Sequence, residues 1–270
     1  MGKGITYPVE LITYGHPKSM LSEAYRSIRT SILLSSSDGP TKMIAITSPN
    51  LGEGKTTTVI NTAIALSQTG ARVLIIDADM RKPRIHKIFN HENGMGLSNF
   101  LSGHGDLELI IKKSEVPNLF YIPAGPIPPN PSELLGSNLF KKMLGVLESR
   151  FDHILVDSPP VLGFADAVVL SSSVQGVILT VLGGKTPRWA LQRAKAVGVV
   201  DRDYSFGSPN HGAVLYNEVR SALYDLARRP HVAGFIAGLG GREVSLDNVT
   251  EMSEILLKVA KAGRLEQPIY

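Results

Sequence analysis

The chain has 270 residues, of which 43% are hydrophobic and 19% are charged, and its formal net charge is +4. This composition is typical of a globular protein and excludes a mainly disordered chain. No apolar stretch approaches the roughly 20 residues of a membrane-spanning helix, the N-terminus lacks the apolar core of a secretion signal, and there is no cysteine. The absence of cysteine fits a cytoplasmic protein. Because the basic residues are mostly scattered, we expect that the protein binds no nucleic acid.

Short apolar runs alternate with stretches of helical spacing along the chain. The runs lie at residues 42–47, 73–77, 119–123, 153–157 and 174–181. Helical spacing occurs between most of them, as at 56–67 and 138–149, and this alternation predicts βαβ units with a parallel sheet. The runs are apolar throughout, which indicates strands covered on both faces. A proline-rich stretch at 123–136 predicts an ordered loop in which Ser132 is a helix N-cap.

The stretch TSPNLGEGKTTT follows the first predicted strand and opens the first long predicted helix. Gly52 and Gly54 allow a tight turn, and a helix that begins near Lys55 adds free N–H groups and its dipole. The P-loop pattern G-x-x-x-x-G-K-[ST] matches at its last three positions, whereas Pro49 replaces its first glycine. The stretch predicts a phosphate-binding loop, with an ordinary glycine turn as the alternative.

Two other predicted strands end in aspartate. The run at 73–77 ends in Asp77 and is followed by Asp79, and the run at 153–157 ends in Asp157. Parallel α/β sheets bind ligands at the carboxyl ends of their strands, and carboxylates beside a P-loop suit Mg²⁺. One such aspartate alone would be a turn or capping residue. Three of them in a sheet that also carries GEGKT predict a site for a nucleotide and Mg²⁺.

These motifs together resemble those of the bacterial tyrosine kinases (BY-kinases) of capsular and exopolysaccharide assembly. Their Walker A, Walker A′ and Walker B motifs resemble TSPNLGEGKTTT, VLIIDADMRKP and ILVDSPPVLGFADA. Four further segments match in order and spacing, namely PKSMLSEAYRSIRTSILLS, NGMGLSNFLSG, PAGPIPPNPSELL and GGKTPR. The resemblance covers about residues 7–195. It implies an α/β fold with a P-loop NTPase-type parallel sheet covered by helices on both faces, followed by a C-terminal α/β extension.

The resemblance implies an ATP-dependent protein-tyrosine (auto)kinase that uses ATP and Mg²⁺. The implied nucleotide-binding residues are Gly52, Glu53, Gly54, Lys55, Thr56 and Thr57. The implied catalytic residues are Lys55, Asp77, Asp79 and Asp157, and the implied metal ligands are Thr56, Asp77 and Asp157. Asp77 would bind the metal and accept the proton of the incoming tyrosine hydroxyl, although a metal ligand alone would explain it equally well.

The resemblance also implies partners. A separate membrane-bound polysaccharide co-polymerase would activate the kinase and hold it at the inner face of the membrane, and the substrates would be tyrosine-containing proteins. Glu23, Arg26 and Arg29 match the E-x-x-R-x-x-R pattern of the family's subunit contact and imply a homo-oligomer. Without the resemblance, the same spacing would indicate an exposed charged face of a helix.

The kinase pattern stops near residue 195. The rest of the chain resembles the C-terminal part of pyruvate (2-oxoacid):ferredoxin oxidoreductase α subunits, notably in DRDYSFG, EVRSALY and GFIAGLGGR. We therefore divide the chain into a P-loop tyrosine kinase domain at 1–195 and an α/β extension of foreign origin at 196–270. A strand at 197–200 would complete the edge of the sheet. No thiamine, iron–sulfur or coenzyme motif in the extension indicates an oxidoreductase.

Two alternatives to a kinase stay open. An ATP-binding switch of the partition-ATPase type is disfavoured, because Pro49 and Asn50 stand where such proteins place a signature lysine early in the loop. A catalytically silent nucleotide-binding chimera is favoured by the absence of the family's C-terminal tyrosine cluster. The tyrosines of the extension are dispersed, at Tyr204, Tyr216, Tyr224 and Tyr270.

Overall fold

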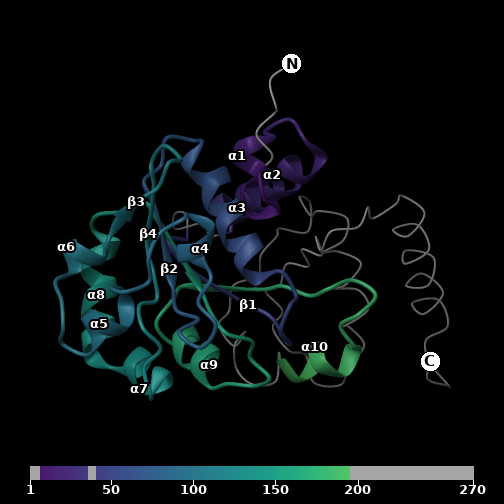
Figure 1. The fold of residues 1–270 in the computed structure, drawn as a ribbon. Coiled ribbons are helices and arrows are strands. Elements are labelled where there is room, and N and C mark those ends of the chain that lie inside the picture. Colours follow the sequence, from purple (N-terminus) through teal and green to yellow (C-terminus); the bar gives the residue numbers. More distant parts are fainter. Residues whose placement is uncertain (1–6, 36–40, 195–270) are drawn as a thin grey trace.

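The computed structural model describes residues 7–35 and 41–194. Within these residues, six strands form one sheet that lies between two layers of helices (Figure 1). The strands are β1 (Met43–Thr47), β2 (Val73–Asp77), β3 (Lys112–Lys113), β4 (Leu119–Ile122), β5 (His153–Asp157) and β6 (Gly176–Leu179). The predicted strand at 197–200, the predicted extension at 196–270 and its four tyrosines lie outside the described residues.

The order of the strands across the sheet is β3-β4-β2-β5-β1-β6. All neighbouring strands are parallel except β3, which pairs with β4 in the antiparallel direction at the edge. The parallel sheet predicted from the sequence is therefore confirmed for the described residues. The two-residue strand β3 escaped prediction because it is too short to show a periodic pattern.

Helices and one 3-10 turn precede, connect and follow the strands. They are η1 (Val9–Leu11), α1 (Ile12–Gly15), α2 (Met20–Leu33), α3 (Lys55–Ser67), α4 (Ile85–Ile88), α5 (Leu97–Leu101), α6 (Leu107–Ile110), α7 (Pro131–Gly136), α8 (Asn138–Glu148), α9 (Asp166–Ser171) and α10 (Arg188–Ala194). Polar caps begin the two longest amphipathic ones: Ser19 accepts a hydrogen bond from the N–H of Ser22 at the start of α2, and Ser137 does so from Phe140 at the start of α8. None of the described helices has the length and apolarity needed to cross a bilayer.

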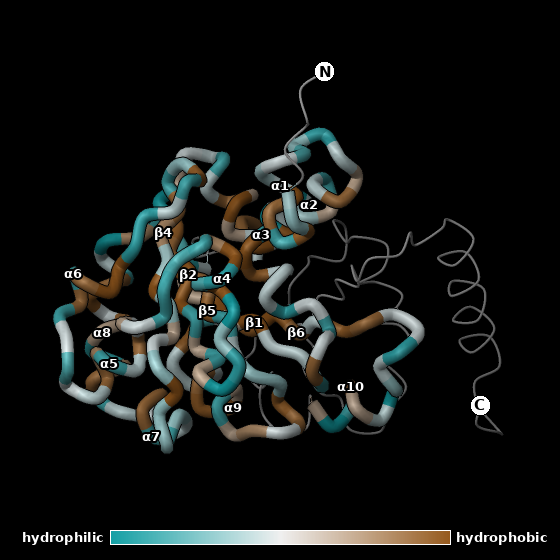
Figure 2. The backbone as a smooth tube through the Cα atoms, in the orientation of Figure 1, coloured by the Kyte–Doolittle hydropathy of each residue, from teal (hydrophilic) through white to brown (hydrophobic). Residues whose placement is uncertain are grey.

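The sheet separates two hydrophobic cores, because successive side chains of a strand point to opposite faces. Leu74 and Ile76 of β2 belong to the core beneath α8, together with Phe140. Ile75, between them, belongs to the core beneath α3, together with Ile64. Figure 2 shows the resulting apolar centre, with β1, β2 and β5 among its most hydrophobic segments. Helices on both faces, as predicted, therefore enclose strands that are buried throughout.

The expected N-cap role of Ser132 is wrong. Helix α7 begins at Pro131, and Asn130 occupies the N-cap position. Proline suits the first position of a helix because its φ angle is fixed near the helical value and it has no N–H to satisfy. Ser132 therefore lies one residue inside the helix, where its hydroxyl donates a hydrogen bond to Asp166 Oδ1 at 2.6 Å.

Candidate functional site

The segment between β1 and α3 forms the turn that its glycines predict. Gly52 and Gly54 have φ angles of +78° and +81°, in the left-handed region that other residues rarely adopt. A Cβ atom at either position would meet nothing within 4 Å, so the backbone conformation rather than crowding calls for glycine. Helix α3 begins directly at Lys55. The turn thus places the free N–H groups at the N-terminus of α3 beside the C-terminal ends of the strands.

The first half of this loop is held by the segment that follows β5. The N–H of Val161 donates to the carbonyl of Ser48 at 2.9 Å, and the N–H of Leu162 donates to the carbonyl of Pro49 at 3.3 Å. The Ser48 hydroxyl donates in turn to the Asn50 carbonyl at 2.6 Å. These bonds fix Pro49 in the position of the missing first glycine.

Glu53 is buried although it lies between the two glycines of the loop. Its carboxylate accepts hydrogen bonds from the backbone N–H of Asn50 at 2.8 Å and from the Asn50 amide at 3.1 Å. A third bond, 2.5 Å long, comes from the hydroxyl of Thr186, which follows β6. The Glu53 side chain is thus engaged in hydrogen bonds within the chain.

Asp77 and Asp157 lie side by side, because β2 and β5 are parallel neighbours that pair these two residues in register. The hydroxyl of Thr56 in α3 donates to Asp157 Oδ2 at 2.7 Å. Asp77 Oδ2 accepts from the N–H groups of Arg84 and Ile85 at 3.2 and 3.1 Å. The end of the phosphate loop and the two strand ends therefore meet at one place, as the sequence predicted.

Each of these carboxylates keeps one oxygen without a partner. Asp77 and Asp157 are 0% and 1% exposed, and the Oδ1 atom of each has no hydrogen-bond partner among the described residues. Burial raises the pKa of Asp77 well above its usual value, and the negative charge of Asp157 adds to the shift. Burial also raises the pKa of Asp157, to about 7, against the opposing charge of Lys55 and the hydrogen bond from Thr56.

Asp79 and Lys55 complete the predicted set. Asp79 is 8% exposed, its Oδ1 accepts the N–H of Lys82 at 3.0 Å, and its charge contributes to the raised pKa of Asp77. Lys55 is 7% exposed, and its ammonium lowers the pKa of Asp157. Buried carboxylate oxygens without partners and a neighbouring hydroxyl are oxygen ligands of the kind that a hard divalent cation takes, and the Lys55 ammonium suits an anionic ligand beside them.

A second polar cluster beside the site was not found from the sequence. Arg81 Nε donates to Asp166 Oδ2 at 2.7 Å, and its Nη2 donates to Oδ1 at 3.3 Å. Asp166 is fully buried, the hydroxyl of Ser132 donates to it, and the Arg81 guanidinium lies over the ring of Phe164 at 4.3 Å. Arg81 and Asp166 are 85 positions apart along the chain, so no local sequence pattern predicts their contact.

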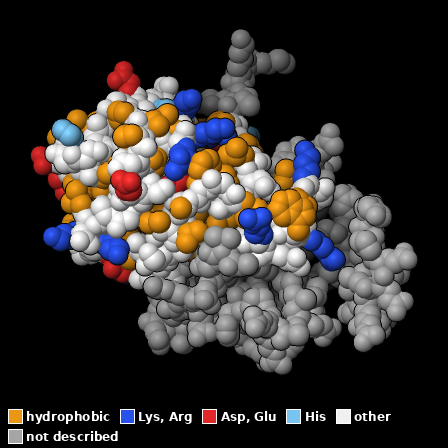
Figure 3. Space-filling model, turned by 90° about the horizontal axis from the view of Figure 1, so that it is seen from below, with side chains coloured by type: hydrophobic (Ala, Val, Ile, Leu, Met, Phe, Trp, Pro, Cys, Tyr) orange, Lys and Arg blue, Asp and Glu red, His pale blue; other side chains and the backbone are white. Residues whose placement is uncertain are grey.

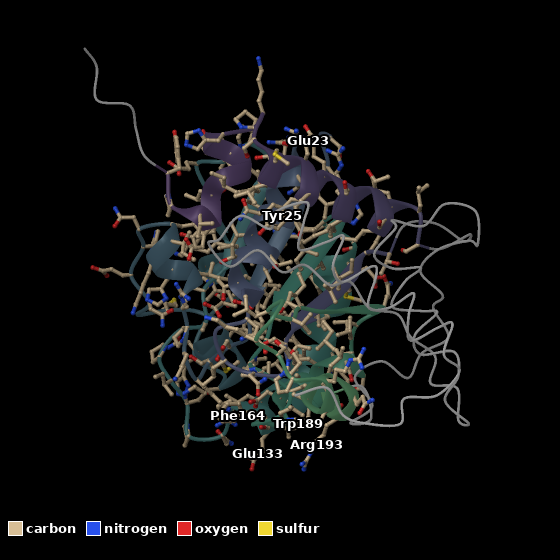
Figure 4. All side chains as sticks on the ribbon, turned by 90° about the vertical axis from the view of Figure 1, so that its right-hand side faces the viewer. Glu23, Tyr25, Glu133, Phe164, Trp189 and Arg193 are labelled. Atoms are coloured by element: carbon tan, nitrogen blue, oxygen red, sulfur yellow. The ribbon has the colours of Figure 1, made fainter. Side chains whose placement is uncertain are left out.

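The three residues of the E-x-x-R-x-x-R pattern lie on α2, which packs against α3. Figure 4 shows Glu23 at the opposite end of the molecule from Trp189 of α10. Arg26 pairs with Glu23 and donates to the Pro17 carbonyl at 2.6 Å, whereas Arg29 donates to the Ala65 carbonyl at 3.1 Å. Glu23, whose side chain is 65% exposed, is the most accessible of the three.

The face that carries α7, α9 and α10 is rich in basic side chains (Figure 3). Lysine and arginine side chains lie across the middle, the right and the lower left of the described surface in this view, and acidic side chains lie mostly toward its left. Basic side chains on this face favour anionic ligands.

Two family models match the chain. One, described as an AAA domain, matches residues 41–184 and includes the whole site. The other, described as core domain II of pyruvate:ferredoxin oxidoreductase, matches residues 185–249. The two matches adjoin at the turn that follows β6.

Relatives with high coverage share the kinase part. Tyrosine-protein kinase YwqD of Bacillus subtilis is 40% identical over 214 residues, which are 79% of this chain and 90% of that protein. The kinase domain of the Escherichia coli tyrosine kinase ETK superimposes with a TM-score of 0.67 and 30% identity, over 74% of this chain and 79% of that one.

A more distant solved structure contains a nucleotide. The septum site-determining protein MinD of Pyrococcus horikoshii, in complex with Mg-ADP, superimposes with a TM-score of 0.51 and 26% identity. The match covers 59% of this chain and 64% of that chain.

Proposed function

This chain belongs to the bacterial tyrosine-protein kinases, and we propose that it transfers the γ-phosphoryl group of ATP to tyrosine hydroxyls with Mg²⁺ as cofactor. The observation that carries the proposal is the pairing of Asp77 with Asp157 in register beside Lys55 and Thr56. Phosphoryl transfer requires in-line positioning and neutralisation of charge more than covalent chemistry, and this cluster supplies groups for both.

The residues present fit Mg²⁺ and a polyphosphate. The buried Oδ1 atoms of Asp77 and Asp157 lack partners among the described residues. Burying two ionised carboxylates without partners costs free energy, and a bound cation would offset that cost. The hydroxyl of Thr56 lies against the same Asp157. Thr56, Asp77 and Asp157 would therefore hold Mg²⁺, which when bound supplies positive charge to the phosphoryl oxygens.

The loop residues would bind and orient the phosphates. The backbone N–H groups of residues 52–57 and the ammonium of Lys55 are the donors, in a loop whose first half is already fixed by the segment after β5. Asp79 would support the acidic cluster from the segment that follows β2. As the family resemblance implies, Asp77 would bind the metal and also accept the proton of an incoming tyrosine hydroxyl.

The test uses γ-labelled ATP, Mg²⁺ and the full chain. We expect label on tyrosine in the wild type and none with Lys55→Met, because the variant loses the charge that holds the phosphates. Lys141→Met, at an exposed position of α8, is the matched control and should label as the wild type does. Release of free phosphate without labelled tyrosine would replace the kinase by an ATP-binding switch. If neither labelled tyrosine nor free phosphate forms, even after the activator's cytoplasmic segment is added, the chain is a silent nucleotide-binding fold.

We further propose the setting that the family resemblance implies. The kinase would regulate capsular or exopolysaccharide synthesis, at the inner face of the membrane, through a membrane-bound polysaccharide co-polymerase. Residues 1–195 would form the kinase domain, and residues 196–270 the extension. Self-association would use α2, where Glu23 is exposed. Glu23→Lys should then lower the sedimentation coefficient of the oligomer, and an unchanged value would reject this contact.

A further inference from the structure

The segment that follows β6 is a tight turn closed by one hydroxyl. The N–H groups of Lys185 and Thr186 donate to the carbonyl of Leu182 at 3.0 and 2.9 Å. Gly184 supports the turn with a φ angle of +71°. The Thr186 Oγ1 atom accepts the N–H of Leu182 at 2.9 Å. Because α10 begins at Arg188, the turn fixes where that helix starts.

The same hydroxyl crosses to the phosphate loop. Thr186 Oγ1 donates to Glu53 Oε1 at 2.5 Å, although the two residues are 133 positions apart. Glu53 also accepts the two hydrogen bonds of Asn50, so that three donors serve one buried carboxylate. Hydrogen bonds to a carboxylate are among the stronger ones in proteins. The Thr186 hydroxyl accepts one hydrogen bond from Leu182 and donates another to Glu53.

The orientation of Glu53 matters because its loop is built for anions. A carboxylate that faced the donors of residues 52–57 would repel a polyphosphate. Its two oxygens instead face Asn50 and Thr186. The turn after β6 thus supplies the partner that keeps this negative charge away from the ligand.

The order of the strands places the turn on a particular side of the loop. β1, which carries the phosphate loop, lies between β5 and β6. The paired acids Asp77 and Asp157 lie on the β5 side, so the metal-bearing end of a triphosphate belongs there. The remaining side of the loop, toward β6 and the turn at 182–186, is where the rest of the nucleotide would extend.

We propose that Glu53 and Thr186 form a positioning clamp, which holds the phosphate loop open to ATP and fixes the turn at 182–186 with α10 beside the nucleotide. Both are positioning residues, because their side chains bind each other and not the reacting atoms. The proposal rests on the proposed function, since it assumes that the loop binds a nucleotide.

The test replaces the hydroxyl of Thr186 with a methyl group and then restores it. Thr186→Val removes the bond to Glu53 and the acceptor for the N–H of Leu182, whereas Thr186→Ser keeps both. The first measurement is the fluorescence anisotropy decay of Trp189, the single tryptophan of the chain, in nucleotide-free protein. The second measurement is the equilibrium Kd for a fluorescent ATP analogue with Mg²⁺.

We expect Thr186→Val to increase the local mobility of Trp189 and to weaken nucleotide binding roughly 10- to 100-fold, the effect of one lost hydrogen bond to a charged group. Thr186→Ser should stay within about twofold of the wild type, by the same estimate. Unchanged Trp189 mobility or an unchanged Kd in Thr186→Val would overturn the clamp, and so would a serine variant that behaves like the valine variant. The proposed function fails separately, if Lys55→Met binds the nucleotide as the wild type does.

Discussion

Replacing Asp157 with asparagine should stabilise the nucleotide-free protein while it removes a proposed metal ligand. The asparagine side chain has nearly the shape of a protonated aspartate, and its carbonyl oxygen can still accept the hydroxyl of Thr56. The substitution removes a buried charge that lies in register with Asp77. A site arranged for a cation should therefore become more stable, and less functional, when one of its acids is made neutral.

The size of the effect follows from the pKa of Asp157. Burial raises it from 3.8 to about 7, so between these values the folded chain holds a proton that the unfolded chain has released. The wild type then loses stability as the pH rises from about 4 to about 7, and changes no further above that range. A shift of roughly three units corresponds to about 4 kcal/mol, since each unit is about 1.36 kcal/mol. This value is a ceiling, because Asp77 adjusts its own protonation when its neighbour changes.

The assay compares the Tm of the wild type and Asp157→Asn in a metal-free buffer from pH 4 to pH 8. We expect similar values near pH 4 and a gain for the variant that grows to several degrees at pH 8, at about 2–4 °C per kcal/mol for a chain of this size. Glu92→Gln, at an exposed loop position between α4 and α5, should show no such trend. A variant that is less stable at pH 8, or a gain independent of pH, would refute the reasoning. Added Mg²⁺ and ATP should stabilise the wild type more than Asp157→Asn.

Three further substitutions test the packing around the site. Arg81→Leu leaves the buried Asp166 without its cation and should lower the free energy of unfolding by about 3 kcal/mol in urea titrations. Thr180→Val removes the hydrogen bond from its buried hydroxyl to the Thr47 carbonyl and should cost about 1 kcal/mol by the same assay. Gly125→Ala forces a side chain onto a φ angle of +80° where a Cβ would lie 2.5 Å from a hydroxyl, and should lower Tm by several degrees in calorimetry.

Much of the fold follows from local sequence patterns. Runs of apolar residues such as 73–77 became strands with the predicted bounds, because strands buried on both faces need a continuous apolar stretch. The short helices around the site were harder to place. Helix α4, of four residues, has no amphipathic period to detect, and α7 begins two residues earlier than an N-cap at Ser132 would place it. Such elements are set by contacts with the sheet and not by their own sequence.

The candidate site was predictable where its residues follow strand ends. Asp77 and Asp157 could be placed together from the general behaviour of parallel sheets, without knowledge of the strand order. The contact of Thr186 with Glu53 could not, because it depends on β6 lying next to β1 and on the turn that follows it. The pair formed by Arg81 and Asp166 escaped for the same reason, since tertiary structure alone brings these segments together.

The stability prediction and the proposed clamp share one electrostatic argument. Asp77, Asp157 and Glu53 are three buried acids at a site proposed to bind a polyanion, but only Glu53 has donors for both of its carboxylate oxygens. Glu53 is thereby kept apart from the ligand, whereas each strand-end acid retains one unpaired oxygen at a cost to the folded chain. A cation shared with the phosphates would remove that cost only when the nucleotide is bound. Relief of the unfavourable burial of Asp77 and Asp157 would then add to the free energy of metal-dependent binding. The same pair should make the chain less stable when no ligand is bound.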